Sequence, residues 1–167
     1  MSDFKSTESQ IYNQAIDETS TTQKVPLGTR IKAIDKASTA YGVGEFIYLQ
    51  GVASTVVGSF VTYDQDDNST ALLVANAIGP VATAMSACVA NEYGWYQIFG
   101  QAVGKGLASL ADNANIYGTA TAGSVDDAIV AGDRVQNAKT TSALDTPATG
   151  LVEVKIQYPI VNNGLAD

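Results

Sequence analysis

The segment GQAVGKG, residues 100–106, has the composition of a loop that could hold a phosphate group. In a phosphate-binding loop, GxxxxGK[ST], backbone N–H groups surround the phosphate and a hydroxyl side chain binds Mg²⁺. Here three residues, not four, separate Gly100 from Gly104, and Gly106 stands where the hydroxyl residue belongs. The spacing therefore argues against a nucleotide site. It predicts instead a strand, GWYQIFGQAV, that ends in a turn at residues 104–106, where glycines allow positive φ.

A second group of chemically capable residues is the acidic run YDQDDNST. Asp64, Asp66 and Asn68 occupy the first, third and fifth positions of an EF-hand calcium loop. However, Ser69 replaces the required glycine, and Ala75 replaces the glutamate of the twelfth position. Because Asp and Asn form turns by bonding their own backbone, the run predicts a hairpin loop and not a metal site.

Three further carboxylates, Asp126, Asp127 and Asp133, could form the acid–base pair of a glycoside hydrolase. Aspartates are ordinary in surface turns, and Trp95 is the only tryptophan available for a sugar platform. The chain contains no histidine, which removes the commonest general base and the commonest metal ligand. We therefore expect a protein that is not an enzyme and needs no cofactor.

Cys88 is the only cysteine, so no disulfide can form within the chain. Its apolar surroundings, MSACVA, predict a buried, unreactive thiol. The N-terminus has no basic region followed by an apolar run, and no apolar stretch reaches the roughly 20 residues that cross a bilayer. We expect synthesis in a cytoplasm and a protein that stays soluble.

Charge limits the classes of partner. The chain has 167 residues and a net charge of −8, and its nine basic residues are scattered. Nucleic-acid binding depends on clustered Lys and Arg that neutralise phosphates, and so does binding to an anionic membrane surface. Neither nucleic acid nor membrane is expected as a partner.

The composition divides the chain into a polar N-terminal arm, residues 1–24, and a β-rich body, residues 25–167. The arm contains few large apolar residues and cannot bury enough surface to fold alone. It is either a disordered terminus or a segment that orders on a partner. In the second case its anchors would be Phe4, Ile11, Tyr12 and Ile16.

The body contains short apolar runs broken by glycine every 8 to 12 residues or so, which predicts an all-β sandwich or barrel. Apolar residues alternate with polar ones from Leu151 to Tyr158, so one face of that strand should be buried. Two short helices are also predicted, one turn at residues 107–110 and a second helix from a Ser124 cap to Gly132.

Eight aromatic residues fall within the predicted strands. Half to two-thirds of them should belong to the core, and the remainder could line a subunit or partner interface because Tyr and Trp are favoured there. Trp95 and Tyr96 are the candidates for that interface. The eight residues are Phe46, Tyr48, Phe60, Tyr63, Tyr93, Trp95, Tyr96 and Phe99.

The ordered strings GEFIYLQGVASTVVGSFVTYD, STALLVANAIGPVATAMSACVANEYGWYQIFG and AGSVDDAIVAGDRV resemble small tailed-bacteriophage proteins that decorate, or cement, the capsid. The resemblance covers roughly residues 25–162. It implies a compact β-barrel or tulip-like body on the outside of an icosahedral shell, a homotrimer, and the major capsid protein as partner. It also implies an extended terminal arm that reaches the shell, a role that residues 1–24 would fit, and no catalytic residues.

The alternative is a phage tail or receptor-binding β-domain that recognises a saccharide of the host surface. Such a domain should carry Trp95, Tyr96 or other aromatic residues together on an exposed face. A cement protein should bury them or place them at a subunit interface.

Overall fold

The structure is a computed structural model that describes residues 4–6 and 14–163. Every paired strand is antiparallel to its neighbours and no helix occurs in these two ranges, so the predicted all-β class is confirmed. The strands are β1 (Phe4–Ser6), β2 (Thr19–Ser20), β3 (Arg30–Asp35), β4 (Val43–Gln50), β5 (Phe60–Tyr63), β6 (Thr70–Leu72), β7 (Ile78–Ala84), β8 (Tyr93–Lys105), β9 (Asn115–Gly118), β10 (Val125–Asp126), β11 (Arg134–Thr140) and β12 (Leu151–Asn162).

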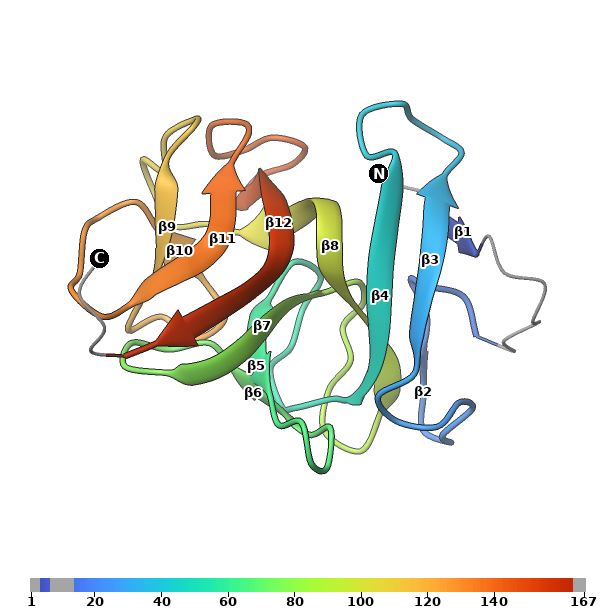
Figure 1. Ribbon diagram of the computed structural model, residues 1–167. Helices are drawn as coiled ribbons and strands as arrows, with labels where there is room; N and C mark the ends of the chain where they lie inside the picture. The colour runs from blue at the N-terminus through green and yellow to red at the C-terminus, as the bar shows by residue number, and fades with distance from the viewer. Residues whose placement is uncertain (1–3, 7–13, 164–167) are drawn as a thin grey trace.

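The sheet runs in the order β1-β3-β4-β8-β7-β12-β11-β9-β10 and does not close into a barrel. The long strand β8 changes partner along its length: its first half pairs with β4 and its second half with β12. In Figure 1, β8 passes from the side of β3 and β4 to the side of β9, β11 and β12. This strand therefore joins the two halves of the body.

The alternation predicted for the last strand is confirmed as far as Ile156 and is wrong at Tyr158, which is exposed. In β12, Val152, Val154 and Ile156 are fully buried, whereas Lys155 is exposed. Apolar side chains on one face of the strand contribute to the core because burying each of them stabilises the fold by about 1.5–3 kcal/mol.

The two predicted short helices are wrong. Around residues 107–110 the backbone is engaged elsewhere, since Leu107 N donates to Val125 O and Ser109 has φ 73°. In the second segment, Val125 and Asp126 form β10 against β9, and the Ser124 side chain is buried instead of capping a helix. Tertiary pairing has overridden a weak local preference for helix.

The predicted strand GWYQIFGQAV is confirmed, but the turn at residues 104–106 is wrong because β8 continues through Lys105. Gly104 pairs with Val152 of β12 in the middle of the sheet. A Cβ at Gly104 would lie 2.4 Å from Cε2 of Phe60, so the glycine is needed for the aromatic ring to approach the strand.

Three clusters of buried side chains form the interior. The first lies among β5, β7, β8, β9, β11 and β12, and the second lies between the residues after Gln14, β3, β4 and the start of β8. The third lies on the opposite face of β4 and β8, under β5 and β7. The second cluster, called the aromatic core below, contains Ile16, Val25, Ile31, Ala33, Tyr41, Phe46, Tyr48 and Trp95.

Candidate functional site

The acidic run forms the predicted hairpin loop between β5 and β6. Asp64 Oδ1 accepts a hydrogen bond from Asp66 N at 2.7 Å, and Asp67 Oδ1 accepts one from Ser69 N at 2.9 Å. Asn68 takes the left-handed conformation, with φ 60°. These are the local bonds by which Asp and Asn make turns, so the loop's conformation is explained without a metal.

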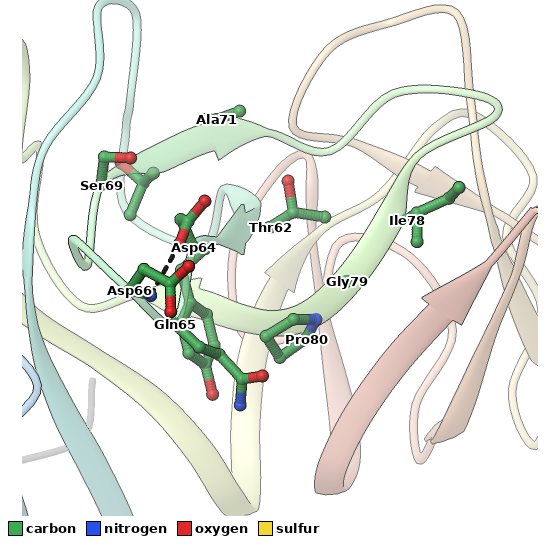
Figure 2. A pocket seen from close by; sticks show the side chains of 11 residues that line it. Thr62, Asp64, Gln65, Asp66, Ser69, Ala71, Ile78, Gly79 and Pro80 are labelled. Carbon is green, nitrogen blue, oxygen red and sulfur yellow. Dashed lines mark hydrogen bonds between the residues drawn. The ribbon is translucent and has the colours of Figure 1, made fainter.

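An open hollow of about 510 Å³ adjoins this loop (Figure 2). The hollow lies between the end of β5, the start of β6 and the start of β7, and its volume is within the range of ligand-binding sites. Its polar lining comes from the acidic loop, and its apolar lining comes from Ile78 and Pro80 on β7. It is lined by Thr62, Tyr63, Asp64, Gln65, Asp66, Ser69, Thr70, Ala71, Ile78, Gly79 and Pro80.

The hollow has an acidic character. None of its lining residues is Lys or Arg, and the sequence has no basic residue between Lys36 and Lys105. Arg30 lies beside the Tyr63 hydroxyl and opposes the rise in the Tyr63 pKa that burial causes. Within residues 4–6 and 14–163 no group of three or more His, Cys, Asp or Glu is arranged to hold a metal ion.

The three carboxylates considered for glycoside hydrolysis serve the backbone. Asp133 is buried, and its Oδ1 accepts a hydrogen bond from Asn76 N at 2.5 Å. Asp127 Oδ2 accepts from Ala111 N at 2.9 Å, and Asp126 Oδ1 accepts from Asp127 N at 2.8 Å. These bonds give all three side chains a structural use, in holding loops together.

The candidate anchors of the N-terminal arm fall in different places. Phe4 is in β1, where it pairs with Asp35 of β3. Ile11 and Tyr12 lie outside the described residues. The Ile16 side chain is only 5% exposed and packs in the aromatic core, so it offers no surface to a partner.

Gln14 holds this part of the chain to the body, and sequence reasoning missed it because the residue stands in a polar segment. Its side chain is buried, and Nε2 donates to Tyr93 O at 2.8 Å and to Glu18 O at 2.9 Å. Its Oε1 accepts from the Tyr48 hydroxyl at 2.6 Å, and its backbone O accepts from Trp95 Nε1 at 3.3 Å. Residues after position 13 are therefore part of the folded body.

Trp95 and Tyr96, the candidates for an aromatic interface, are both 0% exposed. The Trp95 ring meets Tyr48 edge to face, with centroids 5.0 Å apart. Burial raises the pKa of the Tyr96 hydroxyl far above its ordinary value. Of the eight aromatic residues singled out from the sequence, six are buried, and only Tyr93 and Phe99 are not. Trp95 and Tyr96 therefore present no surface for a partner or a saccharide.

A partly exposed aromatic pair, which sequence reasoning did not bring together, is formed by Phe99 and Tyr158, whose ring centroids are 5.4 Å apart. Tyr158 is 47% exposed, and its hydroxyl donates to Glu45 Oε2 at 2.6 Å, which raises its pKa. Glu45 also forms an ion pair with Lys32, at 3.4 Å. The pair therefore lies among charged side chains on the surface.

The alternation of residues 151–158 in the sequence predicts that Tyr158 lies on the buried face of β12. A bulge in β12 places its side chain on the exposed face instead. Between the pairs Gln136↔Ile160 and Ala138↔Ile156, β12 contains two residues more than β11. Tyr158 lies in this interval with φ 51°, a left-handed value that is rare for a bulky residue. The local change of register turns the ring outward.

Cys88 is the buried thiol that its sequence context predicted. Its side chain is fully buried, and burial raises its pKa to about 11. Because the thiolate is the reactive form, this cysteine is not a nucleophile near neutral pH.

No protein-family model, curated protein or solved structure matches the chain. In the part of the chain that the structure describes, no helix is long and apolar enough to span a membrane.

Proposed function

We propose that this protein is a structural virion protein that binds the outside of an icosahedral phage capsid and stabilises the shell without catalysis. The observation that carries the proposal is that the side chains with the chemistry of a catalytic or binding site are either hydrogen-bonded to the backbone or buried. Asp127 and Asp133 accept hydrogen bonds from the backbone, and Cys88, Trp95 and Tyr96 are buried. By this proposal the β-rich body is a scaffold that buries part of its surface on the shell.

The capsid as partner comes from the resemblance of three strings of the sequence to decoration proteins of tailed bacteriophages. By that resemblance the protein is a homotrimer on the exterior of the virion and contacts the major capsid protein. Its acidic balance, a net charge of −8, keeps free subunits apart before they assemble. Many copies bound together need no single strong site.

The test is the number of copies of this chain in purified particles of its source, measured by quantified gel against the major shell protein. Hundreds of copies per particle would support the proposal. A handful would place the protein in the tail, and none would overturn the proposal. Particles that lack the protein should also lose their genome at a lower temperature, and adding the purified protein back should restore the original temperature.

The shell-binding arm is proposed here as residues 1–13, with Phe4, Ile11 and Tyr12 as its anchors. Deleting residues 1–13 removes β1 from the edge of the sheet and should weaken attachment to the particle while the rest of the body stays folded. Deleting residues 1–24 should also destabilise the body, because this removes Ile16 from the aromatic core and removes Gln14, which accepts a hydrogen bond from Tyr48 of that core. Unchanged attachment after the shorter deletion would eliminate the arm.

Saccharide recognition is a second candidate because the Phe99–Tyr158 pair is exposed beside Glu45 and Lys32. Aromatic faces with a few fixed polar groups are typical of small-ligand sites. Calorimetry with purified polysaccharide of the host surface tests this function. Heat that disappears in a Tyr158→Ala variant would support it, and an absence of heat with the wild-type protein would exclude it.

A further inference from the structure

Four exposed apolar side chains, called the apolar end below, gather at one end of the body. They are Val74, Ile78, Ile129 and Val130. Ile129 and Ile78 are 81% and 70% exposed, the highest values among the large apolar residues that the structure describes. Contiguous exposed apolar surface marks sites of interaction with other proteins.

Two loops bring these side chains to the same end. Asn76, between Val74 and Ile78, donates its backbone N–H to Asp133 Oδ1 at 2.5 Å. Asp133 N in turn donates to Val130 O at 3.2 Å. In Figure 1, the loops that precede β7 and β11 both lie on the left of the view. The buried Asp133 thus holds the two loops together.

The apolar end continues into the hollow. Ile78 belongs to both, since it lines the hollow opposite the acidic loop. Figure 2 shows the Ile78 side chain at one end of the hollow and the carboxylates of Asp64 and Asp66 at the other. A partner bound here would contact the apolar surface around Ile78 and, beside it, the carboxylates of Asp64 and Asp66.

Charge decides what the partner must carry. Two carboxylates, those of Asp64 and Asp66, line the hollow together with no Lys or Arg side chain, and the one cation identified beside a lining residue, Arg30, is at the Tyr63 hydroxyl. Asp64 and Asp66 are both exposed, and the carboxylate of Asp64 is held by a hydrogen bond from the Asp66 backbone N–H. A carboxylate held in place attracts a cation at a lower cost in entropy than a freely moving one. The complementary partner is therefore basic.

We infer that the apolar end and the hollow form one docking surface for a protein surface that presents apolar side chains beside a lysine or arginine. The inference rests on the proposed function, because it makes this surface the part of the body that meets the shell. Apolar contact would supply most of the affinity, and the carboxylates would orient the partner.

The experiment uses particles that lack the protein, the purified full-length chain, and the number of bound copies per particle as the readout. Two variants change the proposed docking surface. The double variant Ile78→Asp/Ile129→Asp places charges on its apolar end, and the single variant Asp66→Lys reverses a charge at the hollow. The matched control is Val56→Asp/Val57→Asp, which makes the same change at two exposed valines outside the apolar end. Thermal melting establishes that each variant is folded.

We expect the Ile78→Asp/Ile129→Asp variant to bind at least tenfold more weakly, while the valine control binds like the wild type. Wild-type binding should weaken as salt rises, because salt screens exposed charges. Asp66→Lys should weaken binding at low salt and reduce that salt dependence. Since Asp66 is in an exposed loop, this variant tests the inference even if the double variant fails to fold.

The outcomes separate the inference from the proposed function. A wild-type protein that does not bind the particles overturns the proposed function. A wild-type protein that binds, with both surface variants binding equally well, overturns only the inference. Light scattering adds a further outcome: if Ile78→Asp/Ile129→Asp converts an oligomer into a monomer, the surface joins copies of this chain, and the inference is wrong.

Discussion

Two aromatic pairs with similar distances between their ring centroids lie in opposite environments. The ring centroids of Tyr48 and Trp95 are 5.0 Å apart, and those of Phe99 and Tyr158 are 5.4 Å apart. The first pair is completely buried, whereas Tyr158 is about half exposed. Trp95 and Phe99 even belong to the same strand, β8. Residue type and ring contact therefore do not decide which pair is available to a partner.

The difference comes from what covers each pair. Gln14 accepts a hydrogen bond from the Tyr48 hydroxyl and from the Trp95 indole, so the segment after residue 13 seals the first pair. Among residues 4–6 and 14–163 no segment covers the Tyr158 ring in this way, and its hydroxyl is fixed by Glu45 at the surface. Burial in this protein is completed by a polar segment that binds to aromatic groups through its own polar atoms.

The largest effect expected from this contrast is that of Trp95→Ala. Removing a large buried ring leaves a cavity and should lower the free energy of unfolding by about 3–5 kcal/mol. Phe99→Ala, on the same strand but partly exposed, should cost less than half as much. Urea unfolding followed by circular dichroism measures both. Equal losses would show that the two pairs contribute alike to the fold.

Gln14→Ala should have the next largest effect. The variant leaves the buried Tyr48 hydroxyl and the Tyr93 carbonyl without their partner, a change that costs about 1–3 kcal/mol. Gln23→Ala is the matched control, because Gln23 is exposed in the same N-terminal region. The same urea experiment applies. A Gln14 variant as stable as the Gln23 variant would mean that the segment does not seal the aromatic core.

Cys88 is also fully buried, and the dependence of stability on alkaline pH tests this burial. Its pKa is raised from an ordinary value near 9.0 to about 11 in the folded protein. A raised folded pKa contributes stability that is fully present below pH 9 and is lost as pH rises through 11.

The free energy of unfolding should therefore fall between pH 9 and pH 11, and by about 1–2 kcal/mol less in Cys88→Ala than in the wild type. Burial also raises the pKa of Tyr48 and of Tyr63, so only the difference between the two proteins reports on Cys88. Parallel curves for the two proteins would mean that the thiol ionises as easily when folded as when unfolded.

Sequence alone predicted the features that depend on local pattern. The alternation in residues 151–156 gave the buried face of β12, and the Asp and Asn residues of positions 64–68 gave the hairpin loop. Features that depend on distant partners could not be predicted. Gln14 looks like any polar residue of a leader until Tyr48 and Trp95 are placed beside it.

The candidate site shows the same division. The acidic side of the hollow follows from the absence of basic residues between Lys36 and Lys105, which is visible in the sequence. Its apolar side depends on Ile78 at the start of β7, where alternation cannot tell an exposed isoleucine from a buried one. The bulge that turns Tyr158 outward is equally invisible, since it arises from pairing between β11 and β12.

The smallest effect concerns the backbone at that bulge. Tyr158 has φ 51°, a conformation that disfavours any residue with a Cβ by about 1–2 kcal/mol and suits glycine. Tyr158→Ala and Tyr158→Gly both remove the ring and its bond to Glu45, so the difference between them isolates the backbone. We expect the glycine variant to be more stable than the alanine variant by about 1 kcal/mol in urea unfolding.

The opposite order, with alanine more stable, would mean that the bulge relaxes when the ring is removed. The exposed pair would then be held by the contact with Phe99 and the bond to Glu45, and not by the backbone. If the expected order is found, the strand itself holds Tyr158 outward at a cost in stability. Such a cost is retained where an exposed side chain serves binding, so this result would strengthen the aromatic pair as a binding surface.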